Sequence, residues 1–130
     1  MKFEPKIPAR EFAAGYENKV TIRDCGAIKL DKNEQITFLT EKGGEFDVAR
    51  KSWGFYATPS LNARLKNFGL RSMLARNRDD RYFVLLVETG KEEDFYLYAK
   101  GEPLTLICWL DELANLKEIE ALFQERHDQK

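Results

Sequence analysis

Short runs of alternating apolar and polar residues, each ended by Gly, Asn or Asp, occupy residues 20 to 48. This period of two is typical of strands with one face buried and one face in water, whereas an amphipathic helix repeats every 3.6 residues. The apolar members are Val20, Ile22, Ile28, Leu30, Ile36, Phe38, Phe46 and Val48, and the breaks fall at 24–26, 31–33 and 42–44. The pattern therefore predicts an antiparallel meander with one wet face.

Helical signals begin after a weak strand at 53–57. Thr58 is a good N-cap, and Pro59 follows at the first helical position, where its missing N–H costs nothing. Gly69 is expected to end this helix as a left-handed cap. The residues assigned to the core in this region are Phe55, Leu61, Leu65 and Phe68, of which the last three share one helical face. The sequence thus predicts a helix from residue 59 to 68.

The remaining segments continue the alternation of strand and helix. Strands are expected at 70–75, 82–87 and 104–110, with the last two buried on both faces. A capping box from Thr89 to Glu92 predicts a helix that stops at Gly101, and Asp111 is expected to cap a final helix. From residue 53 on, the order matches a ferredoxin-like, split β-α-β arrangement.

We therefore expect one α+β domain over residues 1–130, with mainly antiparallel sheet. In this domain an N-terminal meander precedes the ferredoxin-like part, and a C-terminal helix follows it. Residues 1–16 contain two prolines and are expected to form an irregular N-terminal arm, with a single helical turn ended by Gly15. Residues 124–130 are expected to be a frayed tail.

The bulk composition excludes several classes of protein. Apolar residues make up 43% and charged residues 33% of the chain, which is ordinary for a globular protein and unlike a disordered one. No apolar run approaches the length of a membrane span, and the N-terminus lacks the apolar core of a signal peptide. Cys25 and Cys108 show no metal-binding spacing and are expected to be reduced thiols. These features favour a cytoplasmic protein that does not enter a membrane.

The charge is unevenly distributed along the chain, although the total is only −1. Residues 50–81 carry a net charge of +6, residues 1–49 carry −1, and residues 82–130 carry −6. The basic middle predicts an anionic partner, while the slightly acidic total argues against a general nucleic-acid binder. The basic and acidic parts are also expected to pair, either inside one fold or between copies in a homo-oligomer.

The predicted helix start at 58–60 is the main candidate for a binding site. The first turn of a helix offers unpaired N–H groups and a partial positive charge, which together favour a phosphate or a carboxylate. The candidate ligand-binding residues are Lys51, Trp53, Tyr56, Thr58, Ser60, Asn62 and Arg64. The plainer alternative is that Thr58 only caps the helix and that the cations form a solvated face.

The aromatic residues of the same segment have two interpretations. Trp53, Phe55 and Tyr56 could stack on bases or sugars, or they could simply be buried, as most such rings are. Catalysis has weaker support, because the single histidine, His127, lies near the C-terminus and a general base needs a fixed position. The acidic groups at 92–94 and 111–112 sit at predicted helix starts, where acids favour the helix dipole.

The sequence therefore favours a small non-enzymatic binding or accessory domain that recognises an anion at residues 50–71. That anion would be a phosphate- or carboxylate-bearing ligand or the acidic surface of a partner protein. One alternative is an enzyme of unidentified class acting on a small anionic substrate, and another is a weak binder of single-stranded nucleic acid. No cofactor or metal is predicted, because no ligand spacing for either is present.

Overall fold

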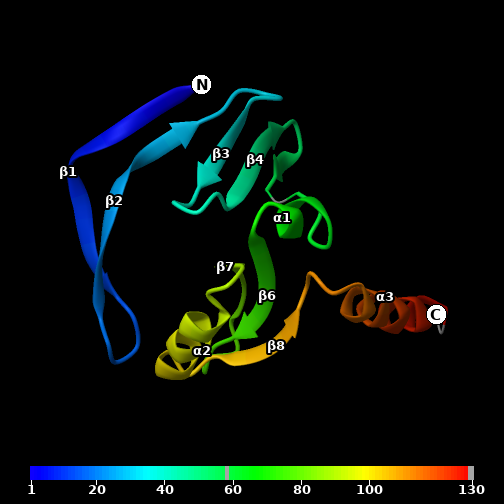
Figure 1. The fold of residues 1–130 in the computed structure, drawn as a ribbon. Coiled ribbons are helices and arrows are strands. Elements are labelled where there is room, and N and C mark those ends of the chain that lie inside the picture. The colour runs from blue at the N-terminus through cyan, green and yellow to red at the C-terminus, as the bar shows by residue number, and fades with distance from the viewer. Residues whose placement is uncertain (58, 129–130) are drawn as a thin grey trace.

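The structure is a computed structural model that describes residues 1–57 and 59–128, with side chains up to residue 127. Over these residues the chain forms three antiparallel sheets and three helices (Figure 1). The predicted α+β class with mainly antiparallel sheet and a C-terminal helix is therefore confirmed. The meander and the ferredoxin-like part need correction, because the strands divide into three small sheets.

Sheet A is a long two-stranded arm built from β1 (Lys2–Ala14) and β2 (Val20–Lys29). The prediction of an irregular segment over 1–16 with a helical turn was wrong, because pairing with β2 holds this segment in a strand. The break expected at 24–26 lies inside β2, opposite a shift of register between Pro5 and Arg10. Gly26 is required there, since a Cβ atom would lie 2.5 Å from the Glu4 carbonyl oxygen.

Sheet B contains β3 (Gln35–Leu39), β4 (Glu45–Lys51) and β5 (Gly54–Tyr56) in that order. The predicted hairpin with its turn at 42–44 is confirmed, and Gly43 adopts a positive φ of 88° in it. Phe38 and Phe46 stack across the pair with ring centroids 5.7 Å apart. One side of this sheet meets the end of β2 at an apolar groove lined by Ile28, Leu30, Val48 and neighbours.

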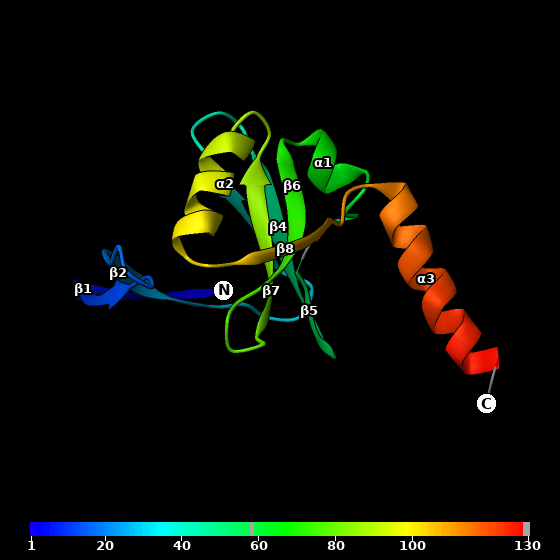
Figure 2. The ribbon, with the colours of Figure 1, turned by 90° about the horizontal axis from the view of Figure 1, so that it is seen from below.

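Sheet C has β6 (Leu70–Arg76) at its centre, between β7 (Tyr82–Glu88) and β8 (Thr105–Trp109). Helix α2 (Glu92–Gly101) covers one face of this sheet (Figure 2). The core forms there from the following residues: Met73, Ala75, Val87 and Phe95, with Leu85, Leu106 and Trp109 packed against them. The burial of β7 and β8 on both faces, expected from their apolar runs, was wrong, because Tyr82, Phe83 and Val84 in β7 and Ile107 in β8 are exposed.

The ferredoxin-like arrangement is not confirmed. In that arrangement the strand at 53–57 would join the same sheet as the three later strands. In the structure β5 pairs only with β4, so it belongs to sheet B, and sheet C keeps three strands. A strand of three residues has little area of its own to bury, and the tight turn at 52–53 is enough to keep it beside its neighbour in sequence.

Two helix ends also differ from the sequence prediction. Helix α2 begins after Lys91 with no side-chain cap, and the Glu92 carboxylate accepts a hydrogen bond from the Gly90 N–H at 2.5 Å. The capping box with Thr89 was therefore wrong. Helix α3 (Leu113–Asp128) continues through the segment expected to fray, up to the last described residue. It stands apart from the sheets (Figures 1 and 2).

Candidate functional site

The helix that carried the anion-site prediction begins later than expected. Helix α1 spans only Arg64–Asn67, so Pro59 is not its first residue, and Thr58 lies outside the described residues. Leu65 is fully buried and anchors this short helix against β6, while Phe68, expected in the core, is 40% exposed. One turn of helix carries little dipole, so the predicted electrostatic basis for an anion site is lost.

The backbone donors ahead of α1 are also already used. The Ser60 hydroxyl accepts a hydrogen bond from the Arg64 N–H at 2.9 Å. The Ser60 carbonyl accepts from the N–H groups of Ala63 at 3.4 Å and Leu65 at 3.0 Å. These bonds satisfy the N–H groups of residues 63–65 at the start of α1. Ser60 therefore organises the loop before α1, and Asn62 lies exposed within that loop.

The hairpin of β4 and β5 presents the aromatic candidates at the surface. Arg50 pairs with Phe55 across the hairpin, and its guanidinium lies 5.4 Å from the centroid of that ring. The same guanidinium donates to the Gly54 carbonyl at 2.8 Å and to the Lys51 carbonyl. These bonds clamp the turn, and Trp53 projects from it with 70% of its surface exposed. The assignment of Phe55 to the core was wrong, because 54% of it is exposed.

The strand register brings three of the predicted residues to one side of sheet B. Lys51 and Tyr56 lie on the same side as Asp47, because side chains alternate along β4 and paired residues share a side. Asp47 accepts from the Arg64 Nε at 3.1 Å, which places Arg64 on this side too. We call Lys51, Trp53, Tyr56 and Arg64 the aromatic tip. Lys51 also donates to the Asn33 side-chain oxygen at 3.0 Å.

Most cations of the basic segment do not pair with the acidic third of the chain. Arg64 pairs with Asp47, and Arg76 pairs with Asp80 at 3.2 Å, both outside residues 82–130. Among the described residues, Arg71 is the one cation of residues 50–81 with an ion pair to that third. The positive charge predicted for this part of the chain therefore persists at the protein surface.

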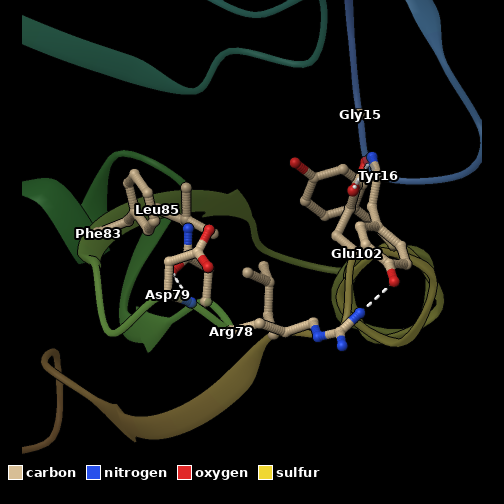
Figure 3. A pocket seen from close by; sticks show the side chains of 10 residues that line it. Gly15, Tyr16, Arg78, Asp79, Phe83, Leu85 and Glu102 are labelled. Carbon is tan, nitrogen blue, oxygen red and sulfur yellow. Dashed lines mark hydrogen bonds between the residues drawn. The ribbon is translucent and has the colours of Figure 1, made fainter.

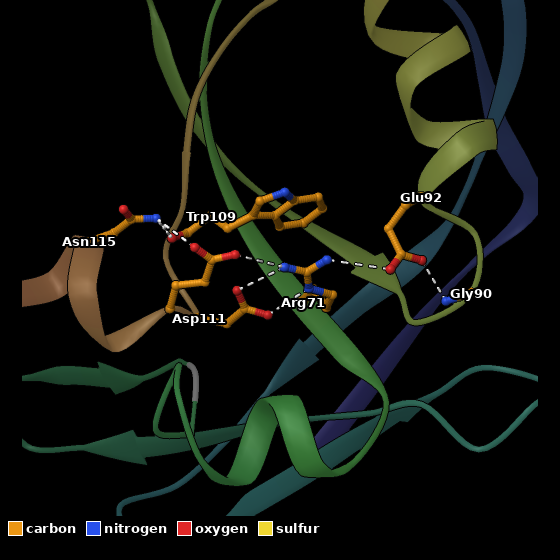
Figure 4. A network of polar contacts seen from close by, with 7 residues as sticks. Arg71, Gly90, Glu92, Trp109, Asp111 and Asn115 are labelled. Atoms are coloured by element: carbon orange, nitrogen blue, oxygen red, sulfur yellow. Dashed lines mark hydrogen bonds and ion pairs between the residues drawn. The ribbon is translucent and has the colours of Figure 1, made fainter.

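Arg71 is the centre of a polar cluster that the sequence did not predict (Figure 4). Its guanidinium binds Asp111 through Nε–Oδ2 at 2.7 Å and Nη2–Oδ1 at 3.3 Å, and it binds Glu92 at 3.4 Å. It also lies 3.9 Å from the ring centroid of Trp109. The acids at 92 and 111 thus hold Arg71, where the sequence suggested helix-dipole and capping roles. The available signal was a cation within a predicted strand, between Leu70 and Met73.

A cleft of about 550 Å³ lies where the arm meets the body of the protein (Figure 3). Its lining includes Tyr16 from the arm turn, Arg78 from the β6–β7 turn and Glu102 after α2. Arg78 donates to the Tyr16 hydroxyl, and Glu102 accepts from the Tyr16 N–H at 2.6 Å. Since these polar groups already bind one another, the cleft serves first as the joint that holds the arm.

The groups considered for catalysis are not gathered at one place. His127 is exposed near the end of α3, and Cys25 is exposed on the arm. Burial raises the pKa of the Cys108 thiol, with a further effect from the nearby Glu112 and Glu118 charges, which keeps it protonated. Over residues 1–57 and 59–127, no cluster of three metal-ligating side chains is present.

The longest helix, α3, has 16 residues, and within the described part of the chain no helix combines the length and apolarity of a membrane span. The functional question therefore rests on the aromatic tip, the Arg71 cluster and the elements that stand apart from the body. In a comparison with known proteins, no family model, no curated protein and no solved structure matches this chain.

Proposed function

We propose that the protein is a binding or accessory domain whose aromatic tip docks onto an acidic surface of a partner protein. The observation that carries this proposal is the exposure of Trp53, 70%, and of Tyr56, 50%, on a clamped hairpin beside Lys51 and Arg64. Large aromatic side chains and Arg supply most of the binding energy in protein interfaces. Two exposed rings on a short hairpin have no role in the core of this fold.

The rigidity of the hairpin supports the same proposal. Arg50 binds the carbonyl oxygens of Lys51 and Gly54, so the turn that carries Trp53 is held in place before any partner arrives. A turn whose backbone is already ordered loses less conformational entropy on binding than a mobile turn does. The tip is therefore suited to enter a concave surface on another protein.

The charge around the tip favours an acidic partner over a neutral one. Arg64 uses Nε for Asp47 and keeps its two terminal nitrogens for further acceptors, and Lys51 donates to a neutral amide oxygen. A carboxylate can accept two parallel bonds from a guanidinium. A partner segment that combines an apolar pocket with Asp or Glu side chains at its rim would match both features. A small anion alone would leave the exposed rings unused.

The experiment screens a library of acidic peptides for binding to the purified protein. The Kd of each selected peptide is then measured by fluorescence anisotropy. We expect Trp53→Ala, and separately the Lys51→Ala, Arg64→Ala double variant, to weaken binding at least tenfold. The matched control removes two exposed cations from other elements, Lys19→Ala in the arm turn with Lys100→Ala on α2, and should leave the Kd within twofold.

Two parallel titrations separate the alternatives. One uses citrate and nucleotides in a thermal-shift assay, and the other uses single-stranded oligonucleotides at several salt concentrations. The proposal is overturned if no acidic peptide binds, or if peptide affinity is unchanged in both tip variants. Steeply salt-dependent binding of oligonucleotides, lost in the same variants and without any peptide binding, would also overturn it, in favour of a nucleic-acid function.

A further inference from the structure

We infer that two copies of this chain form a dimer in which α3 of each copy covers the uncovered face of sheet C of the other. Alternation along the strands divides sheet C into two sides. One side packs against α2. The other, which we call the open face, includes Leu74, Tyr82, Val84, Leu86 and Cys108, placed together by the strand register. The register also places Arg76 and Thr105 at one end of this face and the buried Leu70 and Ser72 at the other.

The open face is largely apolar, yet part of it remains exposed to solvent. Tyr82 is 61% exposed and Val84 52%, while Leu74, Leu86 and Cys108 are half-buried. A sheet with apolar residues on both faces is normally covered on both, because a contiguous apolar surface in water is unfavourable. Helix α2 covers one side. On the opposite side, Leu70 and Ser72 at the start of β6 are already buried, so a second layer is missing over the rest of the open face.

Helix α3 has the complementary feature, an apolar side with nothing against it. The apolar side consists of Leu113, Leu116, Ile119, Leu122 and Phe123, and all except Leu116 are exposed. Among the described residues, α3 makes no extensive contact with any other element, and it points away from the sheets (Figure 2). A helix with an apolar side and a sheet with an apolar face are the two halves of an ordinary two-layer contact.

The chain does not make this contact with itself, because bonds at the start of α3 fix the direction in which the helix leaves the sheet. Arg71 on β6 binds Asp111 in the turn before α3, and the helix then extends away from the sheets on the side opposite to α2 (Figure 2). The Asn115 side chain donates to the Trp109 carbonyl at 2.8 Å, which fixes the first turn of the helix as well (Figure 4). Reaching its own open face would break a buried ion pair, so a second copy is the occupant.

The exposed area of the chain agrees with a missing partner. A compact protein of 15.1 kDa exposes about 7,100 Å². This chain exposes 9809 Å². Each chain of an obligate dimer buries about 1,000–2,500 Å². The excess of about 2,700 Å² therefore accommodates a full dimer interface.

The first test needs no variant: the mass of the protein in solution is measured by sedimentation equilibrium and by light scattering after gel filtration. We expect twice 15.1 kDa at micromolar concentration. Val84→Glu on the open face and Phe123→Glu on α3 should each weaken the dimer at least tenfold. Ala121→Glu, on the opposite side of α3, should leave it unchanged. A monomeric wild-type protein overturns the proposal.

The second test identifies the contact through Cys108, which lies on the open face. In a Cys25→Ser background, Ile119→Cys should form a disulfide with Cys108 of the other copy under mild oxidation and give a covalent dimer. The matched Ala121→Cys variant should not. A covalent dimer of the Ile119→Cys protein that persists after Cys108→Ser would mean that α3 pairs with α3, and this outcome also overturns the proposed arrangement.

Discussion

Arg71 and Asp111, 40 positions apart in sequence, form a two-point ion pair with Nε–Oδ2 at 2.7 Å and Nη2–Oδ1 at 3.3 Å. The hydrogen bond to Asp111 raises the pKa of Arg71, with a further effect from Glu92. Since Asp111 is 1% exposed, the carboxylate has exchanged water for the guanidinium. The pair joins the central strand of sheet C to the turn before α3. One contact therefore fixes both the position of that turn and the direction of the helix.

Replacing Asp111 with Ala should destabilise the protein by about 3 kcal/mol, because a buried cation loses its main partner. Glu92 and Glu112 remain within reach of Arg71 and keep the cost at the lower end of the usual range. The measurement is the free energy of unfolding in urea. Asp80→Asn is the control, since Asp80 is an exposed partner of Arg76, and it should cost less than about 0.5 kcal/mol. Equal costs for the two variants would contradict the importance of burial here.

Truncating a core side chain should lower the stability of the fold much more than truncating a side chain of the aromatic tip. Leu65→Ala removes a side chain with no exposed surface and should cost about 3 kcal/mol. Trp53→Ala removes a larger side chain that is mostly exposed, and its effect should stay within about 0.5 kcal/mol. Thermal unfolding followed by circular dichroism compares the two. A large loss of stability on Trp53→Ala would show that the ring is part of the core.

Asp47 should make the folded state sensitive to acid. A hydrogen bond from the Thr37 hydroxyl at 2.7 Å lowers its pKa below the ordinary value of 3.8, and the bond from Arg64 adds to this. A carboxyl with a lowered pKa in the folded state contributes stability above its unfolded pKa. That contribution is lost as the pH falls through the folded pKa. We therefore expect the stability gap between the wild type and Asp47→Asn to narrow as the pH falls below about 4.

The same prediction can be checked at the carboxyl itself. A ¹³C NMR titration of the wild type should place the Asp47 pKa below 3.8. Thr37→Val removes the first cause of the shift while keeping the shape of the side chain, so the pKa should rise in that variant. An Asp47 pKa that is the same in both proteins would refute the role assigned to Thr37.

The joint between the arm and the body should be local and weak. Glu102→Ala removes the acceptor of the Tyr16 N–H, and Tyr16→Phe removes the hydroxyl that binds Arg78. Both variants should speed hydrogen exchange at residues 14–20 while leaving the midpoint of thermal unfolding within a few degrees. Lys19→Ala, which removes only a contact within the turn, is the control. Unchanged exchange in both variants would place the joint elsewhere.

Local patterns predicted several elements of this fold correctly. The alternation at 36–48 and the glycines at 43–44 gave a hairpin, and the apolar runs at 70–75, 82–87 and 104–110 gave the three strands of sheet C. These features depend on residues close in sequence, so short-range geometry decides them. The same reasoning failed at residues 1–16, where a strand exists only because β2 lies beside it.

The candidate site was predicted in its composition but not in its geometry. The sequence located the basic, aromatic segment, and the structure places Trp53 and Tyr56 at its surface. The sequence did not predict that α1 would have only one turn, or that Ser60 would accept hydrogen bonds from the N–H groups at its start. Helix length there depends on the fit of Leu65 against β6, which is a tertiary contact.

The sequence by itself determined the α+β class, most of the strands and the uneven distribution of charge, because each follows from local residue types. Only the tertiary structure decided which charges meet, which strands share a sheet and which apolar residues remain in water. Arg71 and Asp111 become partners because β6 lies beside β8, which brings the turn before α3 next to Arg71. Such outcomes depend on contacts between distant residues, and no local period encodes them.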